Sequence, residues 1–215
     1  FVPSCTSELM SGLGKLAKEY NVPVQSHLSE NHGEIDWVAA LHPEAANYTD
    51  VYYEHHLMGT VPTVMAHCIH LSDVEMDRMA ETQTMVSHCP YSNVNLSSGI
   101  APIRKLFERE IPIGLGSDIS GGHIVSMAKV LTEAIGLSKM KWVEVDQTYA
   151  PLTLSEAFYM ATKGGGKFFG KVGSFEKGCE FDALVIDDTT LFDPNERSLE
   201  ERLERWLYVG DDRHI

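Results

Sequence analysis

The chain has 215 residues, of which 43% are hydrophobic, a proportion typical of globular proteins and too high for a disordered one. Its formal net charge of −14 argues against non-specific binding to nucleic acid or to an anionic membrane. No apolar stretch is long enough to cross a bilayer and residues 1–5 lack a signal-peptide pattern, so we expect a cytoplasmic protein that binds neither nucleic acid nor membrane.

The first part of the chain predicts two helices with a short strand between them. Residues 8–20 place apolar side chains at helical spacing, and residues 22–27 form a short apolar run that is typical of a strand. Ser29 or Asn31 can cap the next helix, which ends near Pro43.

The middle of the chain predicts three more strands, each followed by a helix. The strands cover residues 61–67, 85–89 and 111–117, and the helices cover residues 73–81, 100–109 and 123–139. Ser72 and Glu75 form a capping-box pattern where the first of these helices begins. Strands that alternate with helices in this way indicate βα units on a parallel sheet. Four such units make half of a (β/α)8 TIM-type barrel, and we expect an α/β fold of that kind.

The C-terminal part departs from this alternation. Residues 152–169 predict a helix that three consecutive glycines interrupt near its end, and residues 172–187 predict a turn followed by a β-strand. That strand would leave the barrel for a small β layer. We therefore expect residues 1–170 to be the second half of a catalytic barrel. Residues 171–215 would be a segment that returns to a small β-sandwich domain.

A polar residue stands at the end of each predicted strand. These residues are His27, His67, His88 and Asp118, and Glu30 follows His27 by three positions. Barrels of this kind carry their chemistry at the C-terminal ends of the parallel strands, so we expect these side chains to meet.

Strand alternation predicts which side chains point into the barrel, because alternate residues share a face. The predicted inward residues are Gln25 and His27, Met65 and His67, and Gly114, Gly116 and Asp118. Glycine weakens the interior of a strand, so two inward glycines before an acid suggest that a larger side chain would collide with a metal or a substrate. A tight corner of the barrel is the alternative explanation.

The residue types at the strand ends suit zinc. A catalytic zinc ion takes nitrogen, sulfur or carboxylate ligands and keeps one position for water, and His27 and Asp118 are candidate ligands. Glu30 is a candidate proton carrier, and His67 could donate a hydrogen bond to the water or the substrate. For His88 the sequence leaves open whether it supports the site or only packs. A single histidine is usually structural, so the prediction depends on the combination.

Two other groups of residues have simpler predicted roles. His70 follows His67 by three positions and could lie in a loop over the site. The four cysteines, which form no Cys-x-x-Cys pair, are expected to be reduced and buried.

Five separated motifs carry a resemblance to a known family. They lie at residues 25–31, at residues 89–93 with 96–99, at residues 116–122, at residues 180–183 and at residues 208–213. With them the chain resembles the zinc-dependent amidohydrolase superfamily, and within it the enzymes that deaminate guanine. The resemblance runs from Phe1 to the end of the chain.

The resemblance implies an aminohydrolase that acts on a C–N bond of a cyclic amidine: a zinc-bound hydroxide converts guanine to xanthine and ammonia. It implies one Zn²⁺ per chain, a homodimer, and metal ligation by His27 and Asp118. In the implied mechanism Asp118 takes up the proton of the water and later passes it to the amine, while Glu30 protonates the ring and His67 steadies the hydroxide. Phe1, His27, Glu30 and Asp118 would contact guanine.

The family also has a feature that the chain lacks. Its members carry a His-x-His on the first barrel strand, and no His-x-His precedes His27. We therefore expect the chain to be a C-terminal fragment that lacks the first barrel strands and that could be inactive alone. Two alternatives remain: a related zinc-dependent amidohydrolase that deaminates a triazine, an adenosine derivative or a pterin, or a non-catalytic barrel scaffold.

Overall fold

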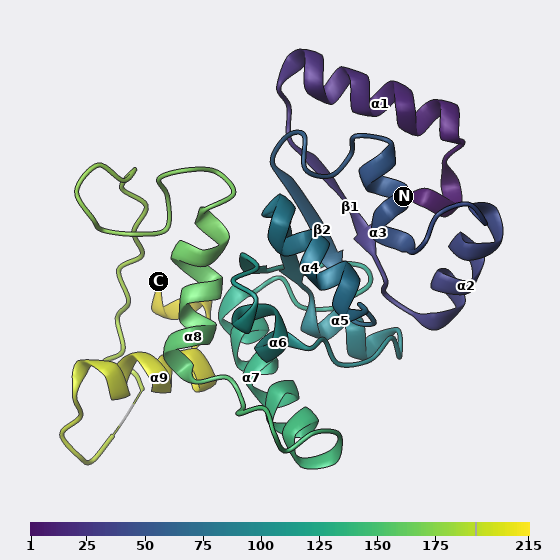
Figure 1. Cartoon of the computed structure of the whole chain (residues 1–215). Helices are drawn as coiled ribbons and strands as arrows, with labels where there is room; N and C mark the ends of the chain where they lie inside the picture. The colour runs from purple at the N-terminus through teal and green to yellow at the C-terminus, as the bar shows by residue number, and fades with distance from the viewer. Residues whose placement is uncertain (192) are drawn as a thin grey trace.

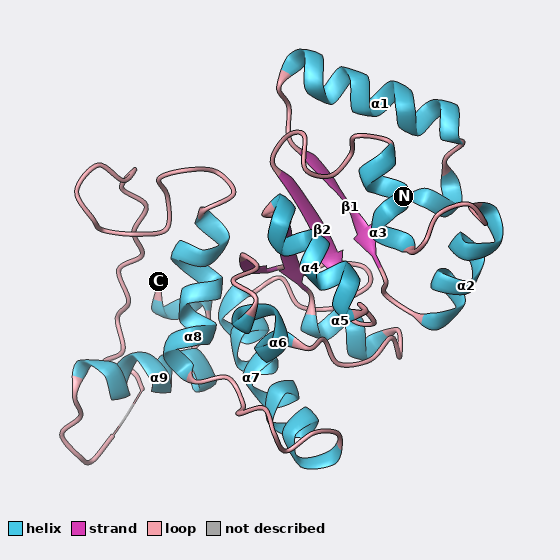
Figure 2. Ribbon diagram, in the orientation of Figure 1, coloured by secondary structure: helices cyan, strands magenta, loops and turns pink. Residues whose placement is uncertain are grey.

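Four parallel strands form the sheet of this protein. The computed structural model describes residues 1–191 and 193–215. The strands are β1 (Val24–Leu28), β2 (Thr63–His67), β3 (Met85–His88) and β4 (Ile113–Leu115). Neighbouring strands pair in parallel and in chain order, and helices lie beside the sheet (Figure 2). The predicted parallel α/β architecture is therefore confirmed.

Helices follow every strand and extend to the C-terminal region (Figure 1). The α-helices of the described residues are α1 (Ser7–Tyr20), α2 (His32–Leu41), α3 (Tyr48–Glu54), α4 (Asp73–Thr82), α5 (Pro90–Asn95), α6 (Ile103–Glu108), α7 (Met127–Glu144), α8 (Leu154–Tyr159) and α9 (Leu199–Val209). Short 3-10 turns cover Val2–Ser4 and Asp212–His214, and a π-helical turn, Met160–Gly164, follows α8. No helix in the described part of the chain is both long and apolar enough to cross a membrane.

Side-chain caps fix where several helices begin. Asn31, rather than Ser29, caps α2 and accepts a hydrogen bond of 2.9 Å from the backbone of Glu34. Ser72 and Glu75 form the predicted capping box at the start of α4. Each cap satisfies backbone N–H groups that have no partner inside the helix.

Two short helices that the sequence analysis did not predict lie close to the ends of the strands. The first, α3, fills the connection between α2 and β2. The second, α5, starts at Pro90, directly after β3. Proline ends a strand because it lacks an N–H group, but the first turn of a helix tolerates it for the same reason. The residue that stops the strand thus also starts a helix.

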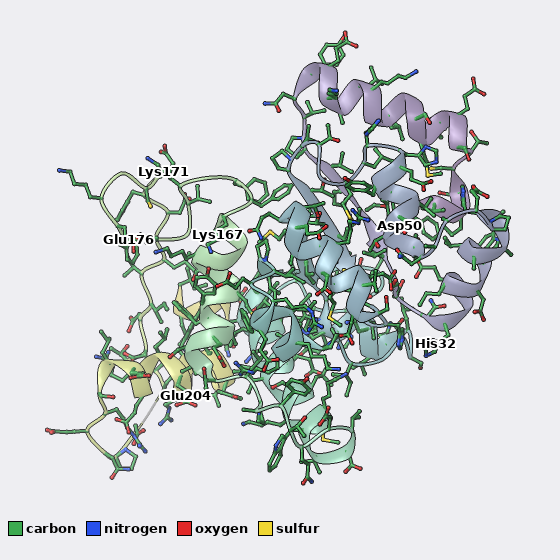
Figure 3. The ribbon with its side chains drawn as sticks, viewed as in Figure 1. His32, Asp50, Lys167, Lys171, Glu176 and Glu204 are labelled. Carbon is green, nitrogen blue, oxygen red and sulfur yellow. The ribbon has the colours of Figure 1, made fainter. Side chains whose placement is uncertain are left out.

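The predicted strand within residues 172–187 is not formed. No strand follows β4 in the described residues, and residues 180–188 run as an irregular segment. A β-strand needs a neighbouring backbone for its hydrogen bonds, and this segment has only single backbone bonds, such as Asp187 N–H to the carbonyl of His214 at 2.8 Å. Figure 3 places Lys171 and Glu176 on the loop after α8, on the opposite side of the molecule from Asp50 of α3. The division near residue 170, and the return to a small β domain, stay predictions.

The two faces of the sheet have different surroundings. One face packs against helices, and its buried residues are Leu28, Met65, Val86 and Ile113. The other face borders a cavity of about 450 Å³, which also receives residues from the ends of the strands. The four cysteines are free; Cys68 and Cys89 are buried as predicted, but Cys5 and Cys179 are partly exposed.

Candidate active site at the ends of the strands

The cavity brings together two of the predicted site residues. Its lining includes Gln25 and His27 from β1, Ala66 from β2, and Gly116 and Asp118 from the end of β4. Gln25 and His27 share this face, as strand alternation predicts, because alternate residues of a strand point the same way. His27 and Asp118, the two predicted metal ligands, therefore lie on the same cavity.

The position of Met65 differs from the one that strand alternation predicts. The register pairs Ser26 with Met65 and His27 with Ala66, so it is Val64 and Ala66 of β2 that share the face of His27. Met65 lies in the hydrophobic core. The prediction that Met65 points into the barrel is therefore wrong, because β2 is offset by one residue from the assumed register.

His67 nevertheless reaches the site. The backbone turns at this residue into the left-handed region, with φ 71°, and Cys68 follows with φ 52°. This conformation is uncommon for residues other than glycine and is often found at functional positions. The ring of His67 lies with its centroid 5.3 Å from that of His27.

Glu30 and His67 form the polar centre of the site. Nε2 of His67 lies 3.7 Å from Oε2 of Glu30, and both side chains are largely buried. Nδ1 of His67 is 2.9 Å from Oδ1 of Asn93, and Ser98 donates a hydrogen bond of 2.9 Å to Oε1 of Glu30. The predicted acid–base residues are thus held by two residues to which the sequence analysis gave no role.

His27 is half-buried between two other rings. Phe1 meets it edge-on, with ring centroids 5.6 Å apart, and His67 lies on another side. Burial lowers the pKa of His27, the neighbouring His67 lowers it further, and Glu30 and Asp118 act in the opposite direction. A lowered pKa favours the neutral imidazole, which is the form that binds metals.

Protein neighbours explain the two glycines of the last strand. A Cβ atom on Gly116 would lie 2.5 Å from Oγ of Ser87 and 2.9 Å from Sγ of Cys89. A Cβ atom on Gly114 would lie 2.9 Å from the Cα atom of Gly165. Close packing within the chain therefore accounts for both glycines. This supports a tight corner of the barrel as the explanation, rather than a collision with a metal or a substrate.

The two other candidate histidines, His88 and His70, lie beside the site. His88 is 1% exposed, and its Nδ1 has no hydrogen-bond partner among the described residues. Burial, and then the proximity of His67, lowers its pKa to about 3, so His88 is neutral at physiological pH. Nε2 of His70 donates to the carbonyl of Ser98 at 2.8 Å, and its ring lies 4.1 Å from that of His32. His70 thus supports the loop that carries Ser98.

The donor atoms fit part of a zinc site. His27 and Asp118 supply an imidazole and a carboxylate, both of which zinc accepts. A catalytic zinc site usually has three protein ligands, and no group of three His, Cys, Asp or Glu residues that could hold a metal occurs in residues 1–191 and 193–215. His27 and Asp118 therefore have donor atoms that suit zinc, but two ligands are too few to complete a catalytic zinc site.

A family model covers the whole chain. Residues 1–215 match the model described as Amidohydrolase family. The chain belongs to the amidohydrolase family. Enzymes of this family are generally metal-dependent, which agrees with the donor chemistry of His27 and Asp118.

Individual amidohydrolases show how close the similarity is. The guanine deaminase of Dictyostelium discoideum is 43% identical over 222 residues, which is 100% of this chain and 49% of that protein. The crystal structure of guanine deaminase from C. acetobutylicum, with guanine bound in its active site, is 54% identical with a TM-score of 0.96 and covers 100% of this chain and 51% of that one. E. coli guanine deaminase is 36% identical, with a TM-score of 0.89 and the same coverage.

These comparisons confirm the predicted fold and the predicted resemblance. The chain has the amidohydrolase fold and is similar over its whole length to guanine deaminases. It spans about half the length of the curated relatives that it matches.

Proposed function

We propose that the complete protein, meaning the gene product that contains these 215 residues and any that flank them, hydrolyses guanine to xanthine and ammonia. One observation carries this proposal. Glu30, His67, His27 and Asp118 gather at the strand ends of a chain that is 54% identical to a guanine deaminase with bound guanine.

Guanine would bind in the cavity at the strand ends. Phe1 is 42% exposed and lies beside His27, so it offers an aromatic surface for a planar purine ring. His27, Glu30 and Asp118 would contact the polar edge of the ring. A planar heterocycle with several hydrogen-bonding groups suits a cavity of this mixed lining.

His27 and Asp118 would hold a zinc ion in the complete protein. A bound zinc ion lowers the pKa of a water ligand from about 15.7 to about 7 and so supplies a nucleophile at neutral pH. The neutral state of His27, which burial favours, suits this role.

The side chains of the site would move the protons of the reaction. Asp118 accepts a proton from the attacking water and later delivers it to the departing amine. Glu30 gives a proton to the ring nitrogen next to the carbon that is attacked, while His67 forms a hydrogen bond to the attacking oxygen. General acid–base help of this kind is worth about 10²–10⁴-fold in rate. The remaining proton of the attacking water returns to Glu30 as the new carbonyl forms and the amine leaves, so guanine and water give xanthine and ammonia and both carboxyl groups regain their starting protonation states.

The test is an assay of the complete protein for conversion of guanine to xanthine, with release of ammonia measured in parallel. Adenosine, a triazine and a pterin serve as competing substrates. A preference for guanine that disappears with a zinc chelator supports the proposal. A preference for another heterocycle would favour a related deaminase, and no turnover of any of them would favour a scaffold.

The assembly and location are part of the same proposal. Family resemblance supports a homodimer, and the acidic composition and free cysteines fit the reducing cytoplasm. Light scattering of the complete protein should give twice the mass of one chain. A monomeric mass would rule out the dimer.

A further inference from the structure

The connection between β3 and α6 carries one of the sequence motifs that has no role in the proposed mechanism. The first part of this connection, residues 89–99, consists of α5 and the turn that follows it and is called the β3–α6 segment. Two of its polar residues, Asn93 and Ser98, are 0% and 5% exposed. Buried polar atoms need hydrogen-bond partners, and Oγ of Ser98 and Oδ1 of Asn93 both have partners among the site residues, whereas Nδ2 of Asn93 has none in the described part of the chain.

Ser98 holds the carboxyl group of Glu30. Its hydroxyl donates to Oε1 at 2.9 Å, while Oε2 of the same carboxyl group lies 3.7 Å from Nε2 of His67. The backbone N–H of Glu30 donates to Oε2 of Glu34 at 2.7 Å. One oxygen of Glu30 is thus fixed by the segment, and the other is directed at His67.

Asn93 holds the ring of His67 from the opposite side. Its Oδ1 accepts from Nδ1 at 2.9 Å, so Nδ1 carries the hydrogen and Nε2 is directed at Glu30. A ring held through one nitrogen has its orientation and tautomer set by that bond.

Backbone hydrogen bonds connect Asn93, on α5, to the turn that carries Ser98. The backbone carbonyl of Asn93 accepts from the N–H groups of Ser98 at 2.8 Å and of Gly99 at 3.3 Å. The carbonyl of Ser98 in turn accepts from Nε2 of His70 at 2.8 Å. The positions of Ser98 and Asn93 are therefore coupled through the backbone.

We propose that Ser98 and Asn93 are positioning residues: the β3–α6 segment sets the orientation of Glu30 and His67 relative to each other. This inference rests on the proposed function, because it gives the pair a reaction to perform. A displacement of about 1 Å at a catalytic group can cost about 10²-fold in rate, so hydrogen bonds that fix two such groups contribute directly to turnover.

The first test compares Ser98→Ala with Ser97→Ala in the zinc-loaded complete protein. Ser97 lies in the same turn and is exposed, so it is a matched control for the same substitution. We expect Ser98→Ala to lower kcat for guanine by about 10–100-fold, with KM changed less than about threefold, and Ser97→Ala to leave both nearly unchanged. Equal kcat values for Ser98→Ala and wild type would overturn the role of Ser98.

Asn93→Ala and Asn95→Ala form the second pair. Asn95 lies on the same helix and is exposed, and its side-chain amide donates a hydrogen bond to the carbonyl of Gly121. We expect a fall in kcat of about 10–100-fold for Asn93→Ala only. Ser98→Cys, which keeps the shape of the side chain with a slightly larger atom and has only a weak donor, replaces Ser98→Ala if that variant does not fold.

A structural readout separates this inference from the proposed function. In a crystal structure of Ser98→Ala, we expect the Glu30 carboxyl group to turn away from His67. If wild-type protein does not convert guanine, the proposed function fails. The orientation of Glu30 in the Ser98→Ala structure still tests whether Ser98 positions this carboxyl group. A Glu30 side chain that keeps its wild-type orientation in the variant would overturn it.

Discussion

His67 and Glu30 face each other across the ends of two neighbouring strands, with Nε2 of His67 3.7 Å from Oε2 of Glu30. His67 is the last residue of β2, and Glu30 lies just beyond the end of β1. The pair therefore depends on parallel pairing, which places the C-terminal ends of both strands at one edge of the sheet. A carboxyl group and an imidazole at this distance can act on the same water or ring, one as proton donor and the other as hydrogen-bond partner.

Replacing Glu30 with glutamine should remove most of the guanine turnover. Glutamine keeps the shape of the side chain and can still accept the bond from Ser98, but it cannot carry the proton. We expect kcat to fall by about 10²–10⁴-fold in a steady-state assay of xanthine formation. Glu19→Gln on the exposed side of α1 is the control. Intact turnover in Glu30→Gln would exclude this residue as the proton carrier.

Replacing Asp118 with asparagine should weaken zinc binding in the complete protein. Loss of outer-shell partners alone typically costs about 10–100-fold in metal affinity, so we expect the loss of a ligand to cost more than about 100-fold. Competition with a chelator, followed by metal analysis, measures this loss. Asp182→Asn, on the exposed C-terminal segment, should bind zinc as wild type does. Unchanged affinity in Asp118→Asn would mean that other residues hold the metal.

The ion pair between Arg104 and Glu156 should make stability depend on pH. Two nitrogens of Arg104 bind the two oxygens of Glu156 at 2.6 and 2.9 Å. These bonds are the main reason that the pKa of Glu156 is lowered from 4.5 to about 2. Because the folded-state pKa is depressed, the pair stabilises the protein above pH 4.5, and this stabilisation is lost as the pH falls towards 2.

The variant Glu156→Gln tests the ion pair, since glutamine can keep the capping box with Thr153. We expect the free energy of unfolding to fall by about 1 kcal/mol at pH 7, and the difference from wild type to shrink on acidification. Urea titrations between neutral and acidic pH measure both effects. Glu176→Gln, which breaks an exposed pair with Lys163, is the control and should have a smaller effect. A difference that does not change with pH would contradict the ion-pair explanation.

Adding a methyl group at Gly116 should destabilise the protein, whereas the same change at Gly136 should not. The new Cβ atom at Gly116 would meet Ser87 and Cys89, and overpacking of this kind costs about 1–3 kcal/mol. Gly136 lies within α7 with no atom within 4 Å of such a Cβ, so Gly136→Ala should stabilise the helix by up to about 1 kcal/mol. Thermal unfolding of both variants gives the comparison. Equal melting temperatures for the two variants would show that the neighbours of Gly116 can move aside.

Local patterns were sufficient where the deciding interactions are local. The capping box of Ser72 and Glu75 predicts the start of α4, and the apolar spacing of residues 8–20 predicts α1 closely. The positions of His27 and Asp118 at strand ends predict that both line one cavity, because all barrels of this kind bring the C-terminal ends of their strands together. The predicted strand within residues 172–187 failed because a strand requires a partner, which a local pattern does not contain.

Sequence patterns predict the four strands and their alternation with helices, the residue types at the strand ends and the family of the chain. The folded chain is needed to see the strand register that places Met65 in the core, the left-handed turn that brings His67 to the site, and the hydrogen bonds made by Asn93 and Ser98. The difference comes from separation along the chain. Helical spacing and caps act between near neighbours, whereas Ser98 meets Glu30 across 68 residues, and that contact exists only once the sheet has placed both elements.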